Sequence, residues 1–523
     1  MANNKGSLNT TINSFFKSHY LGVTTRVGLY VTIFLRQKKP QKGFPLQSLT
    51  QNAINNRIKP KVFILLPDGI GLRNFAYSNF YDIGRKKQMK VVFWNSTPFL
   101  LANLGFEEIK INKTKNNPLT EIYKNAKTQA ELNCNIHKEK DTVYNTYRFP
   151  FSYRNIKAIA KSVTIRTLAF SNSSSKGLRF LRRKMKSEER KTDAYKQAIQ
   201  TLLAEQPAMV FCTNQRHISS IAPLLAAQDL GIPTATFIFS WDNLPKATLV
   251  VEPDYYFVWS NHMKLELLQY YPDIKDEQIF ITGTPQFESH FDASRLLPRT
   301  TFFKNHGLDL AKKYICFSGD DVTTSPDDAT YLEDLAQAVA ILNAKGNAIG
   351  ILFRRCPVDF SDRYDAVIKK YKDIIVPVAP QWEKIGADWS TILPTNNDVT
   401  LQVNTIYHTE MVVNLGSSMV FDYVAHKKPC AYINYDIPKP KDKNWSVKKI
   451  YKFVHFRSMP HKNAVVWLNT KQEIAAKLEQ TLATAATVPW AQKWFEKINQ
   501  HPPQEASERI WNAITKIIQN KND

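Results

Sequence analysis

The sequence predicts an α/β protein with two doubly wound, Rossmann-like αβα domains that face a cleft, followed by C-terminal helices. Two observations lead to this prediction. The chain has 523 residues and is 43% hydrophobic, which is too long for one ordinary core and suits two large domains. Short apolar segments typical of buried strands alternate with helical patterns over most of the length, and such alternation is typical of parallel sheets.

The first half predicts a basic N-terminal arm over residues 1–58 and a Rossmann-like domain over 59–290. The region 112–175 is polar and aromatic and is expected to be mostly helical, with a loop over 148–154. Strands are predicted at 61–66, 91–95, 209–213, 234–239, 255–258 and 279–282, and helices at 184–205, 219–230 and 261–270.

The second half predicts a linker over 288–305, a second domain over 306–485 and C-terminal helices within 486–523. Pro298 and weak periodicity indicate the linker. Strands are predicted at 314–317, 348–353, 374–378 and 411–414, with a further strand after residue 425. Helices are predicted at 327–345, from 398, and at 471–484, 489–498 and 505–520.

The formal net charge is +24, and residues 1–60 contain Lys and Arg but no Asp or Glu. This balance favours an anionic partner. No zinc-knuckle spacing and no aromatic-basic RNA-binding pattern is present, so we expect no nucleic acid. An anionic substrate or an anionic membrane surface is the better interpretation, and a solvated basic face is the alternative.

The five cysteines, Cys134, Cys212, Cys316, Cys356 and Cys430, are scattered. Their spacing favours a reducing compartment and predicts neither a metal site nor a disulfide framework. No signal-peptide pattern is present, so we expect a cytoplasmic protein, with peripheral membrane contact as an option. The apolar segment 21–35 is short for a membrane span and contains Arg26. It could lie in a membrane interface or pack on the protein itself.

The most informative motif runs from Asn414 to Asp422. It predicts a strand, a turn of small residues and a helix. Gly416, Ser417 and Ser418 would lie at the helix N-terminus, where free backbone N–H groups can hold a phosphate. Asp422 lies one turn further along the same face and could bind ribose hydroxyls. An ordinary Ser-capped helix is the alternative.

Polar loops also follow strands of the first half, where ligands of parallel sheets bind. We predict three catalytic candidates there. Asp68 and Asp242 are candidate general bases, and His217 could be a base or could bind the substrate. Helix capping is the alternative for Asp68 and His217. Residues predicted to bind an acceptor are Gly69, Gly71, Arg73, Asn74, Trp241 (by stacking) and Asn243.

In the second half, Ser318 and Gly319 follow a strand and could line a diphosphate site. Arg354 and Arg355 follow another strand and could neutralise a leaving diphosphate without a metal, with simple solvation as the alternative. The loop 391–396, which contains Pro394, could bracket a nucleobase.

Together these loops resemble the GT-B glycosyltransferases, and among them the bacterial surface-polysaccharide enzymes that use UDP-sugars. The resemblance covers roughly residues 61–484, and the order of the motifs is its most specific feature. The motifs are the loop 68–75, Ser240–Leu244, Ile281–Pro285, Leu352–Pro357, and Asn414–Asp422 with Lys428-Pro429.

The resemblance implies an N-terminal acceptor domain, a C-terminal nucleotide-sugar domain and a last helix that crosses back to the first domain. It also assigns the diphosphate to Gly416, Ser417 and Ser418 and the ribose to Asp422. Two positions depart from the family pattern: Cys356 stands where a His is expected, and Asn414 stands where retaining members have a first carboxylate. Cys356 cannot supply the imidazole that would share in phosphate binding. The missing carboxylate at Asn414 favours an inverting, metal-independent mechanism, and we expect no cofactor.

The resulting hypothesis is transfer of a sugar from a nucleotide-diphosphate sugar, with UDP favoured, to a hydroxyl acceptor such as a lipid-linked glycan. Because a fold does not determine a reaction, three alternatives stay open. They are a nucleotide-sugar epimerase, a polyol-phosphate transferase with a CDP-linked donor, and a non-catalytic membrane-docking protein of the same fold.

Overall fold

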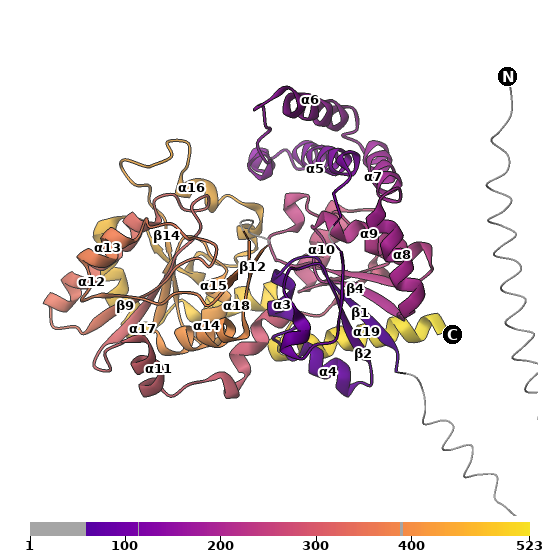
Figure 1. Ribbon diagram of the computed structural model, residues 1–523. Coiled ribbons are helices and arrows are strands. Elements are labelled where there is room, and N and C mark those ends of the chain that lie inside the picture. The colour runs from indigo at the N-terminus through magenta and orange to yellow at the C-terminus, as the bar shows by residue number, and fades with distance from the viewer. Residues whose placement is uncertain (1–58, 113, 387–390, 523) are drawn as a thin grey trace, which may run out of the picture. The chain divides into compact units, whose positions relative to one another are not determined.

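The protein is described by a computed structural model over residues 59–112, 114–386 and 391–522. The predicted basic arm over residues 1–58, including the apolar segment 21–35, lies outside these residues. The described part contains two parallel sheets, each enclosed by helices, and a C-terminal pair of helices (Figure 1). The predicted fold class is therefore confirmed.

Seven parallel strands form the first sheet in the order β3-β2-β1-β4-β5-β6-β7. Val62 of β1 lies between Val91 of β2 and Met209 of β4. The winding direction reverses between β1 and β4, which is where open α/β sheets bind ligands. The strands are β1 (Lys61–Leu66), β2 (Lys90–Asn95), β3 (Glu108–Lys110), β4 (Met209–Cys212), β5 (Thr234–Phe237), β6 (Tyr255–Val258) and β7 (Ile279–Ile281).

The helices of the first half are α3 (Ile70–Phe75), α4 (Phe80–Lys86), α5 (Pro118–Glu139), α6 (Ile156–Ser171), α7 (Ser175–Glu189), α8 (Asp193–Glu205), α9 (Ile221–Asp229) and α10 (Asn261–Tyr270). Side chains of a strand point alternately to the two faces of its sheet. In β1, Phe63 and Leu65 pack with α8 and α9, whereas Ile64 and Leu66 share a core with α3 and α4. Burial on both faces explains the unbroken apolar run of this strand.

Six parallel strands form the second sheet in the order β10-β9-β8-β13-β14-β15, with the reversal between β8 and β13. A short antiparallel pair, β11 (Glu383–Lys384) and β12 (Ile392–Leu393), stands apart from it. The strands of the sheet are β8 (Lys313–Ser318), β9 (Ile349–Arg354), β10 (Ile375–Pro377), β13 (Met411–Asn414), β14 (Cys430–Ile433) and β15 (Val466–Leu468). The helices that follow β7 are α11 (Arg299–His306), α12 (Asp328–Ala344), α13 (Asp365–Lys370), α14 (Asn396–His408), α15 (Met419–Ala425), α16 (Val447–Ile450), α17 (Ile474–Thr484), α18 (Val488–Ile498) and α19 (Ala506–Asn522).

Two predicted elements are wrong in detail. The single helix expected over 184–205 is divided between α7 and α8, because the Thr192 side chain accepts a hydrogen bond from the Tyr195 backbone N–H and starts a new helix. The expected linker 288–305 contains α11 and two short 3-10 helices, since Pro298 caps α11 rather than breaking structure. The edge strands β3 and β15 were not predicted. All five cysteines are free thiols.

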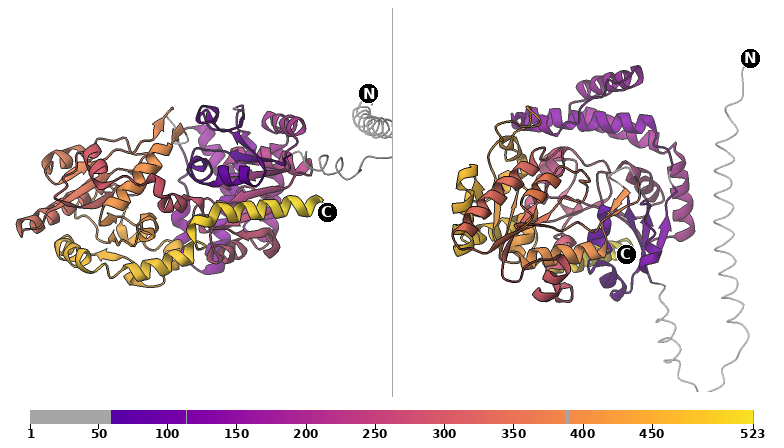
Figure 2. Two further views of the ribbon diagram at one scale, coloured as in Figure 1. Left: turned by 90° about the horizontal axis from the view of Figure 1, so that it is seen from below. Right: turned by 60° about the vertical axis from the view of Figure 1, so that its left-hand side comes forward.

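The last helix, α19, packs on α4 of the first half of the chain (Figure 2, left). Trp511 is fully buried there, its ring stacks on Phe80 at 4.8 Å, and its Nε1–H donates to the Phe80 carbonyl at 2.7 Å. Gly84 permits this approach, because a Cβ at that position would come within 2.3 Å of the Trp511 ring. The C-terminus is thus attached to the first half by a large aromatic side chain.

Candidate functional site

Asp68 lies in the turn after β1 and is 2% exposed. Its carboxylate accepts hydrogen bonds from Asn214 Nδ2 at 2.6 Å and from the Ile70 backbone N–H at 3.1 Å. Asn214 follows β4, so the reversal of the sheet order brings the two loops together. Burial raises the pKa of Asp68, and the nearby His217 acts in the opposite direction. The bond to Ile70, the first residue of α3, is also one that a capping Asp would make.

His217 follows β4 as well, and it caps the short 3-10 helix Ile218–Ser220. Its Nδ1 lies 2.7 Å from Ser219 Oγ. As a cap, Nδ1 accepts the Ser219 backbone N–H at 3.4 Å, and Nε2 then carries the hydrogen. In the other tautomer this cap bond is given up, Nδ1–H donates to Ser219 Oγ, and Nε2 keeps a lone pair that can accept a proton. Burial lowers the pKa of His217, Asp68 opposes this, and Lys124 and Arg216 lower it further. The lowered pKa favours the neutral ring, which is the form that a general base needs.

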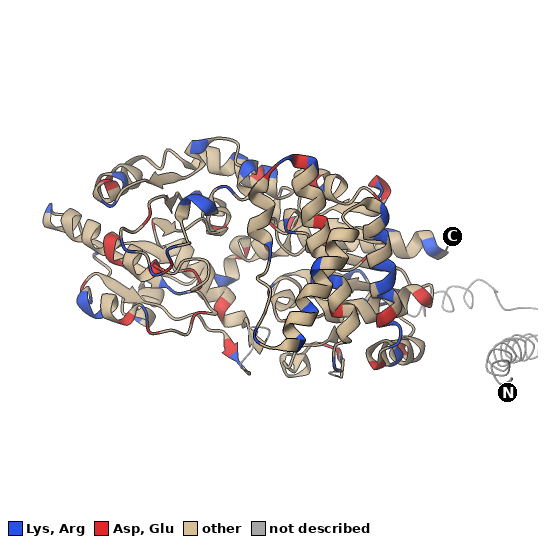
Figure 3. Cartoon of the chain, turned by 90° about the horizontal axis from the view of Figure 1, so that it is seen from above, with Lys and Arg blue, Asp and Glu red and all other residues tan. Residues whose placement is uncertain are grey.

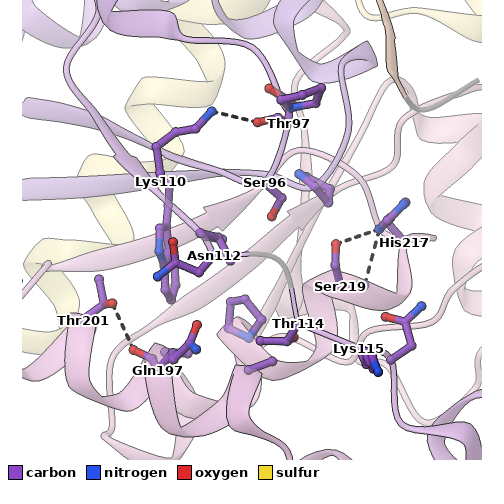
Figure 4. A pocket seen from close by; sticks show the side chains of 18 of the residues that line it. Ser96, Thr97, Lys110, Asn112, Thr114, Lys115, Gln197, Thr201, His217 and Ser219 are labelled. Atoms are coloured by element: carbon purple, nitrogen blue, oxygen red, sulfur yellow. Dashed lines mark hydrogen bonds between the residues drawn. The ribbon is translucent and has the colours of Figure 1, made fainter. Parts of the chain in front are cut away.

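A pocket of about 340 Å³ opens beside His217 at the ends of β1 to β4 (Figure 4). Polar, mostly uncharged side chains reach into it from the segments after β2 and β3 and from α8. The Lys110 ammonium donates to the Thr97 carbonyl at 2.8 Å in its wall. The polar lining residues include Ser96, Thr97, Lys110, Asn112, Thr114, Lys115, Gln197, Thr201, His217, Ser219 and Thr391. Of the lining residues that the structure describes, Thr391 alone comes from the second half of the chain.

Asp242 is a weaker candidate for the base than the sequence suggested. Its carboxylate accepts hydrogen bonds from Ser240 Oγ at 2.6 Å, from Asn243 Nδ2 at 2.9 Å and from the Lys246 ammonium. Burial by itself would raise the pKa of Asp242, but Lys246, His455 and these hydrogen bonds together hold it below its usual range. A carboxylate that binds protons so weakly is a poor general base.

Trp241 is 5% exposed, and four rings enclose it edge-on: Phe421, His455, Phe456 and Trp494. All four belong to the second half of the chain. The predicted stacking on an acceptor sugar does not fit this burial, because an enclosed ring has no free face. Asn243 is equally buried and accepts a hydrogen bond from Gln215. Trp241 therefore helps to join the two halves, whereas the hydrogen bonds of Asn243 stay within the first half.

The turn after β13 has the predicted conformation. Gly416 has a positive φ of 67°, and Ser418 is the N-cap of α15. The Ser417 backbone N–H already donates to Asn414 Oδ1 at 3.0 Å. A Cβ on Gly416 would lie 3.0 Å from the Phe456 ring. One of the N–H groups predicted to hold a phosphate is therefore used within the turn.

Asp422 has a protein partner that the sequence did not indicate. It is 3% exposed, and its Oδ1 lies 2.8 Å from His290 Nε2. His290 Nδ1 lies 3.1 Å from His426 Nε2, and burial lowers the pKa of His426 to about 4. Arg73 approaches the same Asp422 oxygen at 3.9 Å. The carboxylate predicted to bind ribose is thus occupied by a buried contact between the two halves.

The two predicted phosphate-binding arginines differ. Arg354 is 6% exposed and its Nη2 donates to both oxygens of Asp398, at 3.0 and 2.8 Å. Its Nη1 is buried without a hydrogen-bond partner within the described residues. Arg355 is partly exposed, donates to the Ser361 carbonyl at 3.0 Å and lies over the Tyr364 ring. Asp398 therefore holds Arg354 in one orientation, and the Nη1 group of Arg354 can still donate a hydrogen bond to a ligand.

The remaining predicted residues lie in three segments: the turn and helix after β1, the end of β8, and the loop after β12. Gly69 faces Leu393 of β12, since a Cβ there would come within 2.1 Å of that side chain, so the loop after β1 touches the second half. Gly71 and Asn74 are buried in α3. Ser318 ends β8, Gly319 donates its N–H to the Arg354 carbonyl at 2.9 Å, and Pro394 is buried just after β12.

No family model and no curated protein matches the sequence. Solved structures do match. A protein from Listeria monocytogenes described as a UDP-N-acetylglucosamine 2-epimerase is 11% identical, with a TM-score of 0.52 over 88% of this chain and 98% of that one. The UDP-GlcNAc 2-epimerase of Neisseria meningitidis, solved with UDP-GlcNAc, is 10% identical, with a TM-score of 0.50 over 87% and 99%.

These two likenesses, with the two parallel sheets, decide the fold. The chain has the GT-B fold. A glycosyltransferase from Rickettsia africae also matches, at 11% identity and a TM-score of 0.49 over 88% of this chain and 99% of that one. At such identities the likeness extends to the GT-B fold alone.

Most lining residues of the pocket in this GT-B chain were missed from the sequence. A signal was present, because polar residues follow β2 directly from Ser96 and follow β3 at Asn112. β3 has a single apolar residue, Ile109, between two charged ones, so it lacks the apolar run by which the other strands were recognised. The contribution of Gln197 and Thr201 depends on how α8 packs, which no local pattern reports.

The buried Asp422 contact makes a testable prediction. We expect Asp422→Ala to lower the free energy of unfolding by about 1–3 kcal/mol, because His290 would lose its buried hydrogen-bond partner. Asp422→Asn keeps an acceptor oxygen and should lose less. Urea denaturation measures both. An alanine variant as stable as the wild type, with weakened nucleotide binding, would instead support the ribose role.

Proposed function

We propose that the protein is a glycosyltransferase that moves a sugar from a nucleotide-diphosphate sugar, with UDP favoured, to a hydroxyl acceptor. The acceptor we favour is a lipid-linked glycan of bacterial surface polysaccharide or glycolipid synthesis, and the reaction we favour is inverting and metal-independent. The observation that carries the proposal is the pocket beside His217. A transferase needs a place for a second substrate, whereas an epimerase acts on its nucleotide sugar alone.

His217 is the base in this proposal. An acceptor hydroxyl in the pocket would lie against His217 Nε2, which takes its proton as the oxygen attacks the anomeric carbon. The new carbon–oxygen bond forms as the bond to the diphosphate breaks, and the electron pair leaves with the diphosphate. Attack from the pocket side, opposite the leaving group, inverts the configuration. Ser219 holds the imidazole by Nδ1, and buried Asp68 favours the imidazolium that forms.

Arg354 is the residue we favour for the leaving diphosphate. Asp398 fixes the guanidinium, and the buried Nη1, which has no hydrogen-bond partner among the residues that the structure describes, is a ready donor for an anion. We retain Gly416 to Ser418 as a second contact, since the small residues of this turn permit close approach of a ligand. A fixed cation next to developing negative charge stabilises the transition state without rearrangement.

The alternatives are separated by what is released and when. Thermal-shift screening with UDP-, GDP-, CDP- and dTDP-sugars first identifies the nucleotide that binds. Reactions with that donor are then followed with and without lipid-linked glycan acceptors. Release of nucleoside diphosphate only with acceptor supports the proposal. A C2-epimeric product without acceptor indicates an epimerase, release of CMP indicates polyol-phosphate transfer, and absence of nucleotide binding indicates a non-catalytic protein.

A further inference from the structure

The helix α6 lies on the outer side of α5, away from the first sheet (Figures 1 and 2). One face of α6 packs inward: Ile165 and Ala169 share a small core with Ala126 and Ala130 of α5. Ser162 Oγ on the same side donates to the Ser152 carbonyl at 2.9 Å and fixes the preceding loop. These contacts determine which side of the helix points outward.

The outward face of α6 is apolar. Ile156 is 84% exposed, Val163 54% and Phe170 86%, and Ile159 is also exposed. Their spacings of three, four and seven residues place them on one side of a helix. Phe149 in the preceding loop is 81% exposed. A contiguous row of large exposed apolar side chains usually marks a surface that another molecule or a membrane covers.

The charged residues of α6 and of the loop before it all have one sign. Residues 148–171 contain five Lys and Arg and no Asp or Glu. Lys161 pairs with Glu121 of α5 at 2.8 Å, whereas Arg154 and Lys157 are exposed and form no ion pair in the described part of the chain. Figure 3 looks onto this helical layer and shows blue segments along its helices, with red segments among them. The apolar row is thus flanked by unpaired positive charge.

We propose that α6 and the loop before it dock the protein on an anionic membrane surface. Transfer of isoleucine and valine side chains into the hydrocarbon region lowers the free energy of binding. Attraction between the neighbouring Arg and Lys and the anionic headgroups lowers it further. A second copy of this face, or the basic arm over residues 1–58, would bring like charges together. Nucleic acid would match the charge but leave the aliphatic row in water. In the described residues no helix is both long and apolar enough to cross a bilayer.

The docking surface differs from the donor and acceptor residues, so it can be tested without knowing the reaction. The full chain is sedimented with vesicles of phosphatidylcholine alone and of phosphatidylcholine and phosphatidylglycerol in equal parts. We expect binding to the second kind, weakened by raising the salt concentration. The double variant Ile156→Ser with Phe170→Ser should weaken partitioning by about tenfold or more, because binding scales with the apolar area inserted.

A matched control removes exposed apolar side chains elsewhere. Leu265→Ser with Leu310→Ser should bind vesicles as the wild type does, since both leucines are exposed on other elements. Arg154→Gln with Lys157→Gln should reduce binding to anionic vesicles and leave the thermal melt unchanged. The proposal fails if the Ile156 and Phe170 variant pellets like the wild type, which would assign binding to the arm, or if neutral vesicles bind equally well.

Discussion

Replacing His217 with alanine is expected to lower kcat by about 10²–10⁴-fold, the range that a positioned general base contributes. In the proposed function the imidazole is the base, and Asp242, one of the two carboxylate candidates, is held as a weak base chiefly by Lys246. Donor affinity should change little, because His217 follows β4, whereas the favoured donor residues are Arg354 at the end of β9 and Gly416 to Ser418 after β13. Steady-state kinetics with the donor and acceptor identified above measure the effect.

The pH profile gives His217 a distinct signature. A base acts only when unprotonated, and burial lowers the pKa of His217 below its ordinary value of 6.5. The acid limb of kcat/KM should therefore lie below pH 6.5, and it should vanish from the residual activity of His217→Ala. Ser219→Ala removes the hydroxyl that contacts His217 Nδ1. It should lower kcat and change KM less.

His137→Ala is the matched control for this experiment, because His137 is exposed on α5 away from the pocket. It should retain wild-type kinetics. If His217→Ala keeps full activity while Asp242→Asn loses it, the base has been assigned to the wrong residue.

Replacing Trp511 with alanine is expected to lower the free energy of unfolding by about 3–5 kcal/mol, the usual cost of removing a buried tryptophan. The variant loses the stacking on Phe80 and leaves a cavity against Gly84. It also leaves the Phe80 carbonyl without the indole N–H. Guanidinium denaturation followed by far-UV circular dichroism measures the loss.

Two further substitutions separate packing from hydrogen bonding. Trp511→Phe retains a ring against Phe80 and should lose about 1 kcal/mol for the missing hydrogen bond plus a smaller packing term. Trp490→Ala removes an only partly buried tryptophan that stacks on His461, and it should cost much less. Equal losses at Trp490 and Trp511 would show that α19 is not anchored as described.

The strands that carry the two sheets could be predicted because they are buried on both faces. β1, β4, β9 and β13 are short unbroken apolar runs, and such runs depend only on local composition. The edge strands β3 and β15 escaped. In β3 only Ile109 is apolar, between Glu108 and Lys110, whereas the equally short edge strands β7 and β10 are apolar and were predicted. The division between α7 and α8 depends on one capping threonine within a continuous charged pattern.

The sequence by itself determined the chemistry that is available at each strand end: Asp68 and His217 in the first half, and Arg354 and the turn at Gly416 in the second. It did so because ligands of parallel sheets gather at these ends, whatever their detail. Only the tertiary structure decided which of these groups are free to act. Asp422 is paired with His290, Trp241 is enclosed and Asp242 is bound to Lys246, whereas His217 faces a pocket. Except for the Asp242–Lys246 pair, these contacts join segments far apart in the sequence, so a local pattern could not report them.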